Sequence, residues 1–200
     1  MIKAYFRPKT IQEAVDLLSS PDQKMVPLGG GTILSQNRDH EVAVVDLQEC
    51  GLDRIAAHGS LLRIGATATL QTIGAHPGLS EHLREAVSKE ANVNIRQKAT
   101  IAGCVVSSDG RSVFLTALLA LDSTLSWLPG SQQQGIGAFL LSRDEDWPGK
   151  FIEWVAIPLS AKLRVASVGR SPADLPVICV SLAVWPTGRV RIALGGFGPY

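Results

Sequence analysis

The sequence predicts an α+β protein, and three features of the chain indicate this class. Strand and helix signals alternate over residues 1–55, which is the pattern of a small unit with a parallel sheet. Apolar residues recur at helical spacing between residues 70 and 121. Beyond residue 124, short apolar runs follow one another directly, separated by Gly, Pro and Ser clusters, as antiparallel strands are.

The N-terminal unit is predicted to contain strands at 4–6, 25–28 and 43–47, with a helix after the first of them. Thr10 and Glu13 have the spacing of a capping box, so we expect the helix to begin directly after Thr10. Strand, helix and strand at this spacing predict parallel pairing.

Helical spacing of apolar residues and short apolar runs predict the remaining helices and strands. A strand is expected at 61–64, and helices at 70–75, 81–91 and 112–121. Further strands are expected at 124–128, 151–157, 163–168, 177–184 and 190–194. Pro186-Thr187-Gly188 lies between the last two strands and predicts a hairpin turn.

The composition excludes several classes of protein. Of the 200 residues, 46% are hydrophobic and 18% charged, which is enough apolar surface to offset the entropy of ordering the chain. The net charge of +1 gives no basic footprint for a phosphate backbone, so we expect no nucleic-acid partner. The longest apolar stretches, 113–121 and 177–184, are too short to cross a bilayer.

The cysteines and the first residues indicate the compartment. Cys50, Cys104 and Cys179 are odd in number and far apart, which argues against a disulfide framework, a zinc ribbon or an iron–sulfur cluster in this chain. The segment Met1 to Pro8 lacks the apolar core of a signal peptide. A cytoplasmic location is therefore expected.

Three consecutive glycines and a threonine, Gly29 to Thr32, follow a predicted strand and precede a possible helical turn at Ile33 and Leu34. Leu34 stands where a dinucleotide fingerprint needs its third glycine, and no Gly-Lys-Ser/Thr follows as in a P-loop. Two interpretations remain. Successive N–H groups without a Cβ can bind a phosphate, or the glycines only form a strand-to-helix turn.

Other catalytic chemistries have weaker signals. The four histidines lack His-Glu-x-x-His spacing, and no Gly-x-Ser-x-Gly elbow is present. A second glycine-containing loop is predicted at Thr100 to Gly103, and the adjacent Cys104 is expected to be a small buried apolar residue.

At the glycine loops the sequence resembles a known family. Six segments, in order along nearly the whole chain, are similar to the flavin-binding subunit of molybdenum hydroxylases, which includes the medium chain of aerobic carbon monoxide dehydrogenase and the central domain of xanthine dehydrogenase. These segments are Pro27 to Thr32, Val45 to Leu47, Leu62 to Thr67, Ile95 to Cys104, Arg170 with Asp174, and Arg191 to Gly196.

The resemblance implies a two-subdomain α+β FAD-binding fold of the PCMH type. It divides the chain into an α/β subdomain at 1–55, a second FAD-binding subdomain at 56–160 and the start of a shortened C-terminal domain at 161–200. The FAD pyrophosphate is expected between the two glycine loops, held by the N–H groups of Gly29 to Thr32 and of Ile101 to Cys104. A side chain at Gly30 would then obstruct the phosphate.

The resemblance also implies the cofactor contacts and the partners. The expected cofactor-binding residues are Leu28, Gly29, Gly30, Gly31, Thr32, Ile33, Leu34, Thr100, Ile101, Ala102, Gly103, Cys104, Asp109 and Ile152. No catalytic side chain and no metal ligand is expected, because the flavin carries the chemistry. Molybdopterin and [2Fe-2S] clusters are expected only on partners, namely a molybdopterin-binding large subunit and an iron–sulfur small subunit.

Four departures from the family pattern leave two functions open. Ala102 and Cys104 replace a Gly and an Asn, Val113 replaces an acidic residue, and Ser167 stands near the position of a lysine expected beside the flavin ring. One interpretation is an electron-transfer flavoprotein subunit of a molybdenum dehydrogenase, with reduced FAD affinity. The other is a degenerate scaffold subunit that binds FAD weakly or not at all.

Overall fold

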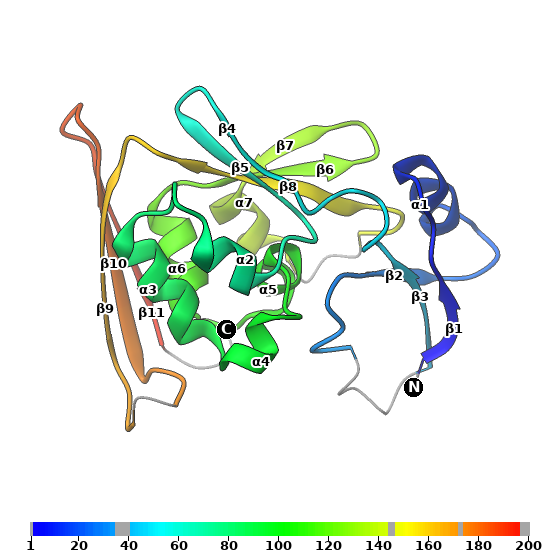
Figure 1. Cartoon of the computed structure of the whole chain (residues 1–200), viewed down its shortest axis with the longest axis horizontal. Coiled ribbons are helices and arrows are strands. Elements are labelled where there is room, and N and C mark those ends of the chain that lie inside the picture. The colour runs from blue at the N-terminus through cyan, green and yellow to red at the C-terminus, as the bar shows by residue number, and fades with distance from the viewer. Residues whose placement is uncertain (1, 35–40, 144–146, 172–173, 197–200) are drawn as a thin grey trace.

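The chain forms three β-sheets with helices between them (Figure 1). The computed structural model describes residues 2–34, 41–143, 147–171 and 174–196. In Figure 1 the N-terminal sheet lies at one end, the C-terminal sheet at the other, and the five-stranded sheet spans the helices between them. The predicted α+β class is confirmed.

The N-terminal sheet is parallel, as the spacing predicted. Its strands are β1 (Ile2–Phe6), β2 (Met25–Leu28) and β3 (Val42–Asp46), in the order β1-β3-β2. Helix α1 (Ile11–Leu18) connects β1 and β2. The Thr10 hydroxyl accepts a hydrogen bond from the N–H of Glu13, while the Glu13 carboxylate accepts one from the N–H of Lys9 instead of Thr10. Thr10 therefore caps the helix as predicted, but the hydrogen bond from the backbone to Glu13 comes from Lys9, one residue before the cap.

The middle sheet is antiparallel, in the order β4-β5-β8-β6-β7. Its strands are β4 (Ile55–His58), β5 (Leu61–Gly65), β6 (Thr124–Leu128), β7 (Gln132–Gly135) and β8 (Phe151–Pro158). The sequence did not predict β4 or β7, which are the two edge strands. Both are short and mostly exposed, so neither carries the apolar alternation that marks a half-buried strand.

The helices fill the space between this sheet and the C-terminal one (Figure 1). They are α2 (Leu70–Ala75), α3 (Glu81–Glu90), α4 (Val93–Arg96), α5 (Ile101–Ser107), α6 (Val113–Ala120) and α7 (Ile136–Leu141). Helix α6, predicted at 112–121, is the most apolar of them. Every residue of α6 except Leu119 is buried, because sheets and helices surround it.

The predicted loop at Thr100 to Gly103 is instead the start of a helix. Thr100 caps α5, and its hydroxyl accepts a hydrogen bond from the N–H of Gly103 at 3.2 Å. Helices α4, α5 and α7 were not predicted; they have four, seven and six residues, and α5 begins in the segment that was expected to be a glycine-containing loop.

The C-terminal sheet is antiparallel and contains β9 (Lys162–Val168), β10 (Ile178–Val184) and β11 (Val190–Gly195). The predicted hairpin turn joins β10 and β11, and Gly188 there has a φ of +83°. One face of the sheet packs on α6, whereas the other exposes apolar side chains, among them Val190, Ile192 and Leu194.

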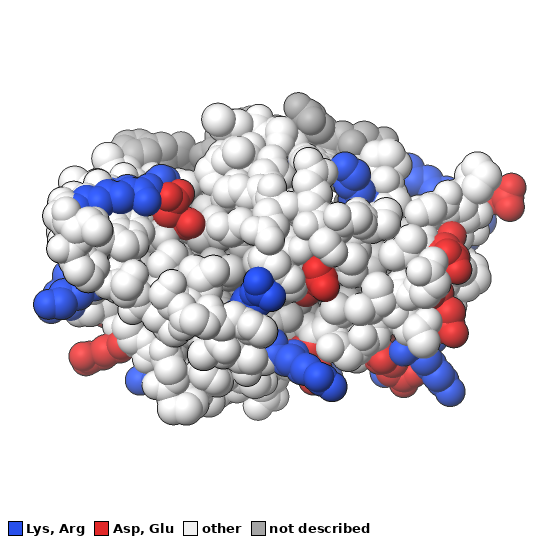
Figure 2. Space-filling view, turned by 90° about the horizontal axis from the view of Figure 1, so that it is seen from above, with Lys and Arg blue, Asp and Glu red and all other residues white. Residues whose placement is uncertain are grey.

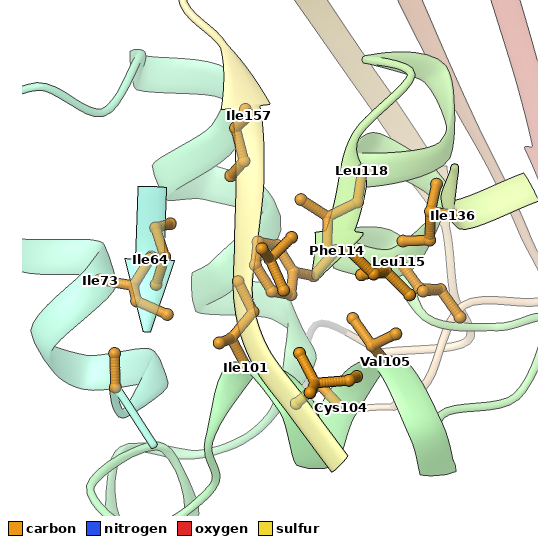
Figure 3. Close-up of a cluster of buried hydrophobic side chains, with 14 of the residues drawn as sticks. Ile64, Ile73, Ile101, Cys104, Val105, Phe114, Leu115, Leu118, Ile136 and Ile157 are labelled. Carbon is orange, nitrogen blue, oxygen red and sulfur yellow. The ribbon is translucent and has the colours of Figure 1, made fainter. Parts of the chain in front are cut away.

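One continuous core joins the three parts of the molecule. Figure 3 shows part of this core, with Ile101 and Val105 of α5, Phe114 and Leu118 of α6 and Ile157 of β8 in one cluster. The same cluster extends to α1 and to the inner face of the C-terminal sheet. At about 25 cal/mol per Å² of apolar area, burial of these side chains is the main stabilising term.

Charged side chains are sparse on the surface. Seen from above the five-stranded sheet, they stand singly or in small groups of mixed sign, with wide uncharged areas between them (Figure 2). This matches a charged fraction of 18% and a net charge of +1. None of the helices in the described residues is long and apolar enough to cross a membrane.

Candidate functional site

A cavity of about 490 Å³ lies where the N-terminal sheet meets the rest of the chain. Its wall combines the loop after β2, the first turn of α5, the ends of α3 and β6, and the start of β8. Most of the lining is apolar. A mostly apolar cavity with a few polar groups is typical of a cofactor site.

The glycine loop supplies the polar part of this wall. Within the described residues, the N–H groups of Gly29, Gly30 and Gly31 donate to no acceptor. Gly31 has a φ of +69°, the left-handed conformation that glycine adopts without steric cost. Residues 32–34 form a turn, and a helical continuation would fall at 35–40, outside the described residues. Consecutive unpaired N–H groups on a cavity wall form an anion-binding arrangement.

The loop also touches the opposite wall. A Cβ on Gly30 would stand 1.6 Å from the carbonyl oxygen of Lys98, and one on Gly29 would stand 2.5 Å from the Thr100 hydroxyl. Packing against Lys98 is therefore by itself a reason for glycine at position 30, and the expected obstruction of a phosphate stays a prediction. The missing side chain of Gly30 makes room for the backbone of the neighbouring segment, which brings Thr100 and Gly29 together at the cavity.

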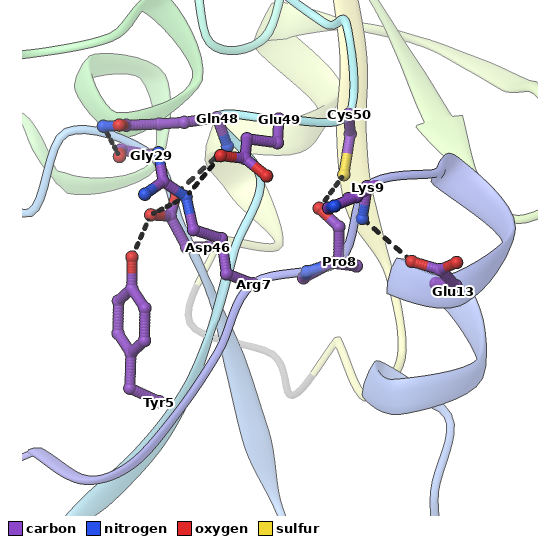
Figure 4. Close-up of polar contacts among 10 residues, drawn as sticks. All are labelled: Tyr5, Arg7, Pro8, Lys9, Glu13, Gly29, Asp46, Gln48, Glu49 and Cys50. Carbon is purple, nitrogen blue, oxygen red and sulfur yellow. Dashed lines mark hydrogen bonds and ion pairs between the residues drawn. The ribbon is translucent and has the colours of Figure 1, made fainter.

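A hydrogen-bonded chain fixes the outer side of the loop (Figure 4). The amide Nε2 of Gln48 donates to the carbonyl oxygen of Gly29 at 3.0 Å. The N–H of Gln48 donates to the carboxylate of Asp46 at 3.0 Å, and the Tyr5 hydroxyl donates to the same carboxylate. This last bond raises the pKa of Tyr5. Arg7 adds an ion pair with Asp46 at 3.7 Å.

The second expected phosphate loop is arranged differently. Its four N–H groups already donate within the chain, Ile101 to the carbonyl of Ala68 and Ala102 to that of Ala66. Gly103 and Cys104 donate to the hydroxyl and the carbonyl of Thr100. Each of the four groups thus already has an acceptor within the chain, which weakens the expectation that they hold the pyrophosphate; that contact stays a prediction.

Glu90 places a carboxylate at the same cavity, at the end of α3. Its oxygens accept hydrogen bonds from the hydroxyls of Ser108 and Ser112, at 2.8 and 2.7 Å, and from the N–H of Phe114 at 3.4 Å. Burial nevertheless raises the pKa of Glu90, because removal from water disfavours the charged form more than these bonds favour it. No sequence motif indicated a role for Glu90.

Aromatic rings form a further part of the wall. The rings of Trp127 and Trp147 stack with centroids 4.8 Å apart, and Phe139 lies 5.3 Å from Trp127. Lys150 lies 5.4 Å above the Trp147 ring. All four line the cavity. Sequence reasoning missed them because they come from β6, α7 and the segment before β8, and only the fold brings them together.

Two polar atoms in the lining residues lack a partner. The Nε1 of Trp127 and the hydroxyl of Thr67 are buried and form no hydrogen bond in the described part of the chain. Buried donors without an acceptor cost about 1–3 kcal/mol each. A bound polar ligand would remove that cost.

The cavity collects most of the residues that the sequence singled out. Those that line it are Leu28, Gly29, Gly30, Gly31, Thr32, Ile33, Leu34, Thr100, Ala102, Gly103, Cys104 and Ile152. Ile101 does not, because its side chain is fully buried in the core. Asp109 does not either, and its carboxylate pairs with Arg111.

The residues that depart from the family pattern lie at different places. Cys104 lines the cavity and is buried, as expected, and burial raises the pKa of its thiol. Val113 is enclosed within the core, and Ser167 accepts a hydrogen bond from Lys89. Neither of these two lines the cavity. Among the described residues, no group of three His, Cys, Asp or Glu side chains could hold a metal ion.

Comparisons with known proteins place this site in context. The sequence profile of a family described as the FAD binding domain in molybdopterin dehydrogenase matches residues 1–160. The uncharacterized protein YgfM of Escherichia coli K12 is 28% identical over 210 residues, covering 98% of this chain and 75% of that protein. The nicotinate dehydrogenase FAD-subunit of Eubacterium barkeri is 30% identical over 148 residues, covering 68% of this chain and 49% of that subunit.

The fold has close counterparts among solved structures. One chain of carbon monoxide dehydrogenase from Hydrogenophaga pseudoflava superimposes with a TM-score of 0.84, over 98% of this chain and 75% of that one. The two are 20% identical, so this comparison shows the fold alone. The two-subdomain α+β architecture expected from the resemblance is confirmed.

Proposed function

This chain belongs to the family of FAD-binding domains of molybdopterin dehydrogenases, and from that premise we propose that it binds FAD and relays electrons within a molybdenum-containing dehydrogenase. FAD, when bound, supplies the redox chemistry, so the side chains of this protein need only bind, orient and shield it. The observation that carries the proposal is the set of three unpaired N–H groups of Gly29, Gly30 and Gly31 on the cavity wall.

These N–H groups suit the pyrophosphate of FAD. A nearly neutral chain can hold two negative charges on amide dipoles, because each N–H places a partial positive charge against a phosphate oxygen. Because these N–H groups have no acceptor within the described chain, a phosphate oxygen can bind them without breaking a hydrogen bond of the protein. We assign the phosphate contacts to Gly29, Gly30 and Gly31 and not to the start of α5, whose N–H groups already have acceptors.

The two ends of the cavity suit the two ring systems of FAD. Trp127 and Phe139 are 4% and 1% exposed, so the aromatic wall lies at the more enclosed end of the cavity. Ile33, Ile95 and Val106 also line the cavity but are 37–52% exposed. The isoalloxazine ring must exchange electrons with other subunits, so we place it at the exposed end and the adenine ring at the aromatic wall.

The expected partners are an iron–sulfur subunit, which delivers electrons, and a molybdopterin-binding subunit. Relatives carry names such as "medium subunit" of nicotine 6-hydroxylase and "FAD-subunit" of nicotinate dehydrogenase, which describe components of larger enzymes. The exposed apolar face of the C-terminal sheet supports assembly with other chains, since contiguous apolar surface marks interaction sites.

A second function, that of a scaffold subunit with weak FAD binding, is favoured by one observation. Cys104 lines the cavity where the family pattern has an asparagine, and a thiol is a much weaker hydrogen-bonding group than an amide. The loss of one hydrogen bond amounts to about 0.5–1.5 kcal/mol, or roughly two- to tenfold in affinity. Val113 and Ser167 add no comparable loss at the cavity, because they do not line it.

A titration with FAD tests the proposal. The purified protein is stripped of flavin by dialysis against a chaotropic salt, refilled with FAD and followed by the visible flavin spectrum and by tryptophan fluorescence. Saturable binding of one FAD per chain, with quenching that reports Trp127 and Trp147, is expected. If FAD lowers the tryptophan fluorescence only by the inner-filter effect, the scaffold function is favoured.

A further inference from the structure

We propose that Gln48 is a positioning residue for the anion site, on the premise that the proposed function is correct. Its side chain fixes the peptide group between Gly29 and Gly30 so that the Gly30 N–H faces the cavity. Gln48 itself does not line the cavity and lies 19 residues from Gly29 in sequence. Nothing in the glycine motif indicates that a residue after β3 controls it.

The geometry of one peptide group carries the inference. The bond between Gly29 and Gly30 is trans, so its C=O and its N–H point in opposite directions. Gln48, which is not among the lining residues of the cavity, donates to that C=O at 3.0 Å. The N–H of Gly30 therefore points away from Gln48, towards the side on which the glycines line the cavity.

Such a restraint is needed because glycine peptide groups rotate easily. The parallel ladder between β2 and β3 ends where the N–H of Leu47 donates to the carbonyl of Leu28 at 3.0 Å. The next carbonyl, that of Gly29, lies beyond this ladder, and glycine on both sides of the peptide group leaves its dihedral angles little restricted. A flip would turn the carbonyl oxygen towards the phosphate and replace attraction by repulsion. The bond from Gln48 opposes that flip.

Gln48 is held in place by the end of β3 (Figure 4). The Asp46 side chain, 4% exposed as a residue, accepts the N–H of Gln48 at 3.0 Å and so fixes the turn that carries it. The Tyr5 hydroxyl and Arg7 hold the same carboxylate from β1 and the segment after it. Tyr5, Asp46, Gln48 and Gly29 thus form one connected path from the N-terminal sheet to the loop.

The test compares ligands with and without phosphate in the full chain. Gln48→Met keeps the length of the side chain and removes its N–H donor, and Gln133→Met on the exposed edge strand β7 is the matched control. Binding of FAD, ADP, riboflavin and adenosine is measured by tryptophan fluorescence. We expect Gln48→Met to lower the affinity for FAD and ADP about two- to fivefold, because a partly exposed hydrogen bond is lost. The affinities for riboflavin and adenosine should not change. Gln133→Met should change none of the four.

A second readout reports the peptide group directly. In ¹⁵N-labelled protein, the amide resonance of Gly30 should shift in Gln48→Met and respond less to added ADP, while melting temperatures stay equal. A merely structural role would lower the affinity for all four ligands together. If Gln48→Met and wild type bind FAD with equal affinity, the positioning role of Gln48 is overturned, while the proposed phosphate site is not. If the wild-type chain binds FAD no more tightly than riboflavin, the proposed phosphate site itself fails.

Discussion

Gly30 lies directly against the carbonyl group of Lys98, so close that a Cβ on Gly30 would stand 1.6 Å from the Lys98 oxygen. This contact joins the loop after β2 to the segment that leads into α5. The cavity owes its shape to that contact, because the loop and Thr100 form adjacent parts of its wall. The glycine at position 30 is thus required by packing as well as by any ligand.

Gly30→Ala is expected to destabilise the protein by more than about 3 kcal/mol, since backbone on both sides must move to admit the methyl group. Chemical denaturation measures the free energy of unfolding. Gly135→Ala is the control, because its Cβ would meet nothing within 4 Å, and it should change stability by no more than about 0.5 kcal/mol. Similar stabilities for the two variants would show that the two segments are not in close contact.

Glu90→Gln should alter how stability depends on pH. Burial raises the pKa of Glu90 above its ordinary value of 4.5, so between that value and the raised one the folded chain binds more protons than the unfolded chain. Stability therefore falls as pH rises through this window. The free energy of unfolding of Glu90→Gln minus that of wild type should become more favourable as the pH rises above 4.5. A difference that is constant with pH would contradict the burial of this carboxyl.

The three cysteines should be unreactive in the folded protein. Cys50, Cys104 and Cys179 are free and buried, and burial raises the pKa of each thiol, so little reactive thiolate forms at neutral pH. A colorimetric thiol reagent at pH 7.5 should react with less than one thiol per chain before unfolding and with three in denaturant. Fast reaction of one thiol in the native chain would mean that a cysteine is accessible.

The exposed face of the C-terminal sheet should matter for assembly and little for folding. Ile192 is 65% exposed on β11, so Ile192→Glu should change stability by less than about 0.5 kcal/mol. The variant should bind candidate iron–sulfur and molybdenum subunits more weakly than wild type in light scattering. His58→Glu, on the exposed edge strand β4, is the control. Equal assembly of all three proteins would exclude this face as an interface.

The sequence predicts the frame of the molecule better than its cavity. Parallel strands in the first unit, the capped helix after Thr10 and the antiparallel C-terminal sheet all follow from local signals, and all are present. The glycine loop was identified because consecutive glycines are rare and have a clear steric meaning. Edge strand β7, Gln132–Gly135, could not be predicted because an exposed edge strand needs no alternation of apolar residues in the sequence.

The rest of the site depends on contacts between distant segments. Trp127 and Trp147 stack although 20 positions separate them, and Gln48 reaches a carbonyl 19 residues away. The N–H groups of Ile101 and Ala102 are engaged by carbonyls of Ala68 and Ala66, which no local pattern predicts. Such pairings are set by how the sheets pack, so one sequence alone does not show them.

The most direct test of the account compares Gly31→Asp with Gly31→Asn in a titration with FAD. A Cβ at Gly31 meets only Leu28 at 3.5 Å, and Asp and Asn both tolerate its φ of +69°, so the two variants should fold alike. They differ in one negative charge beside the unpaired N–H groups. If these groups hold the pyrophosphate, Gly31→Asp should bind FAD at least about tenfold more weakly than Gly31→Asn. Equal affinities would contradict the glycine loop as the phosphate site.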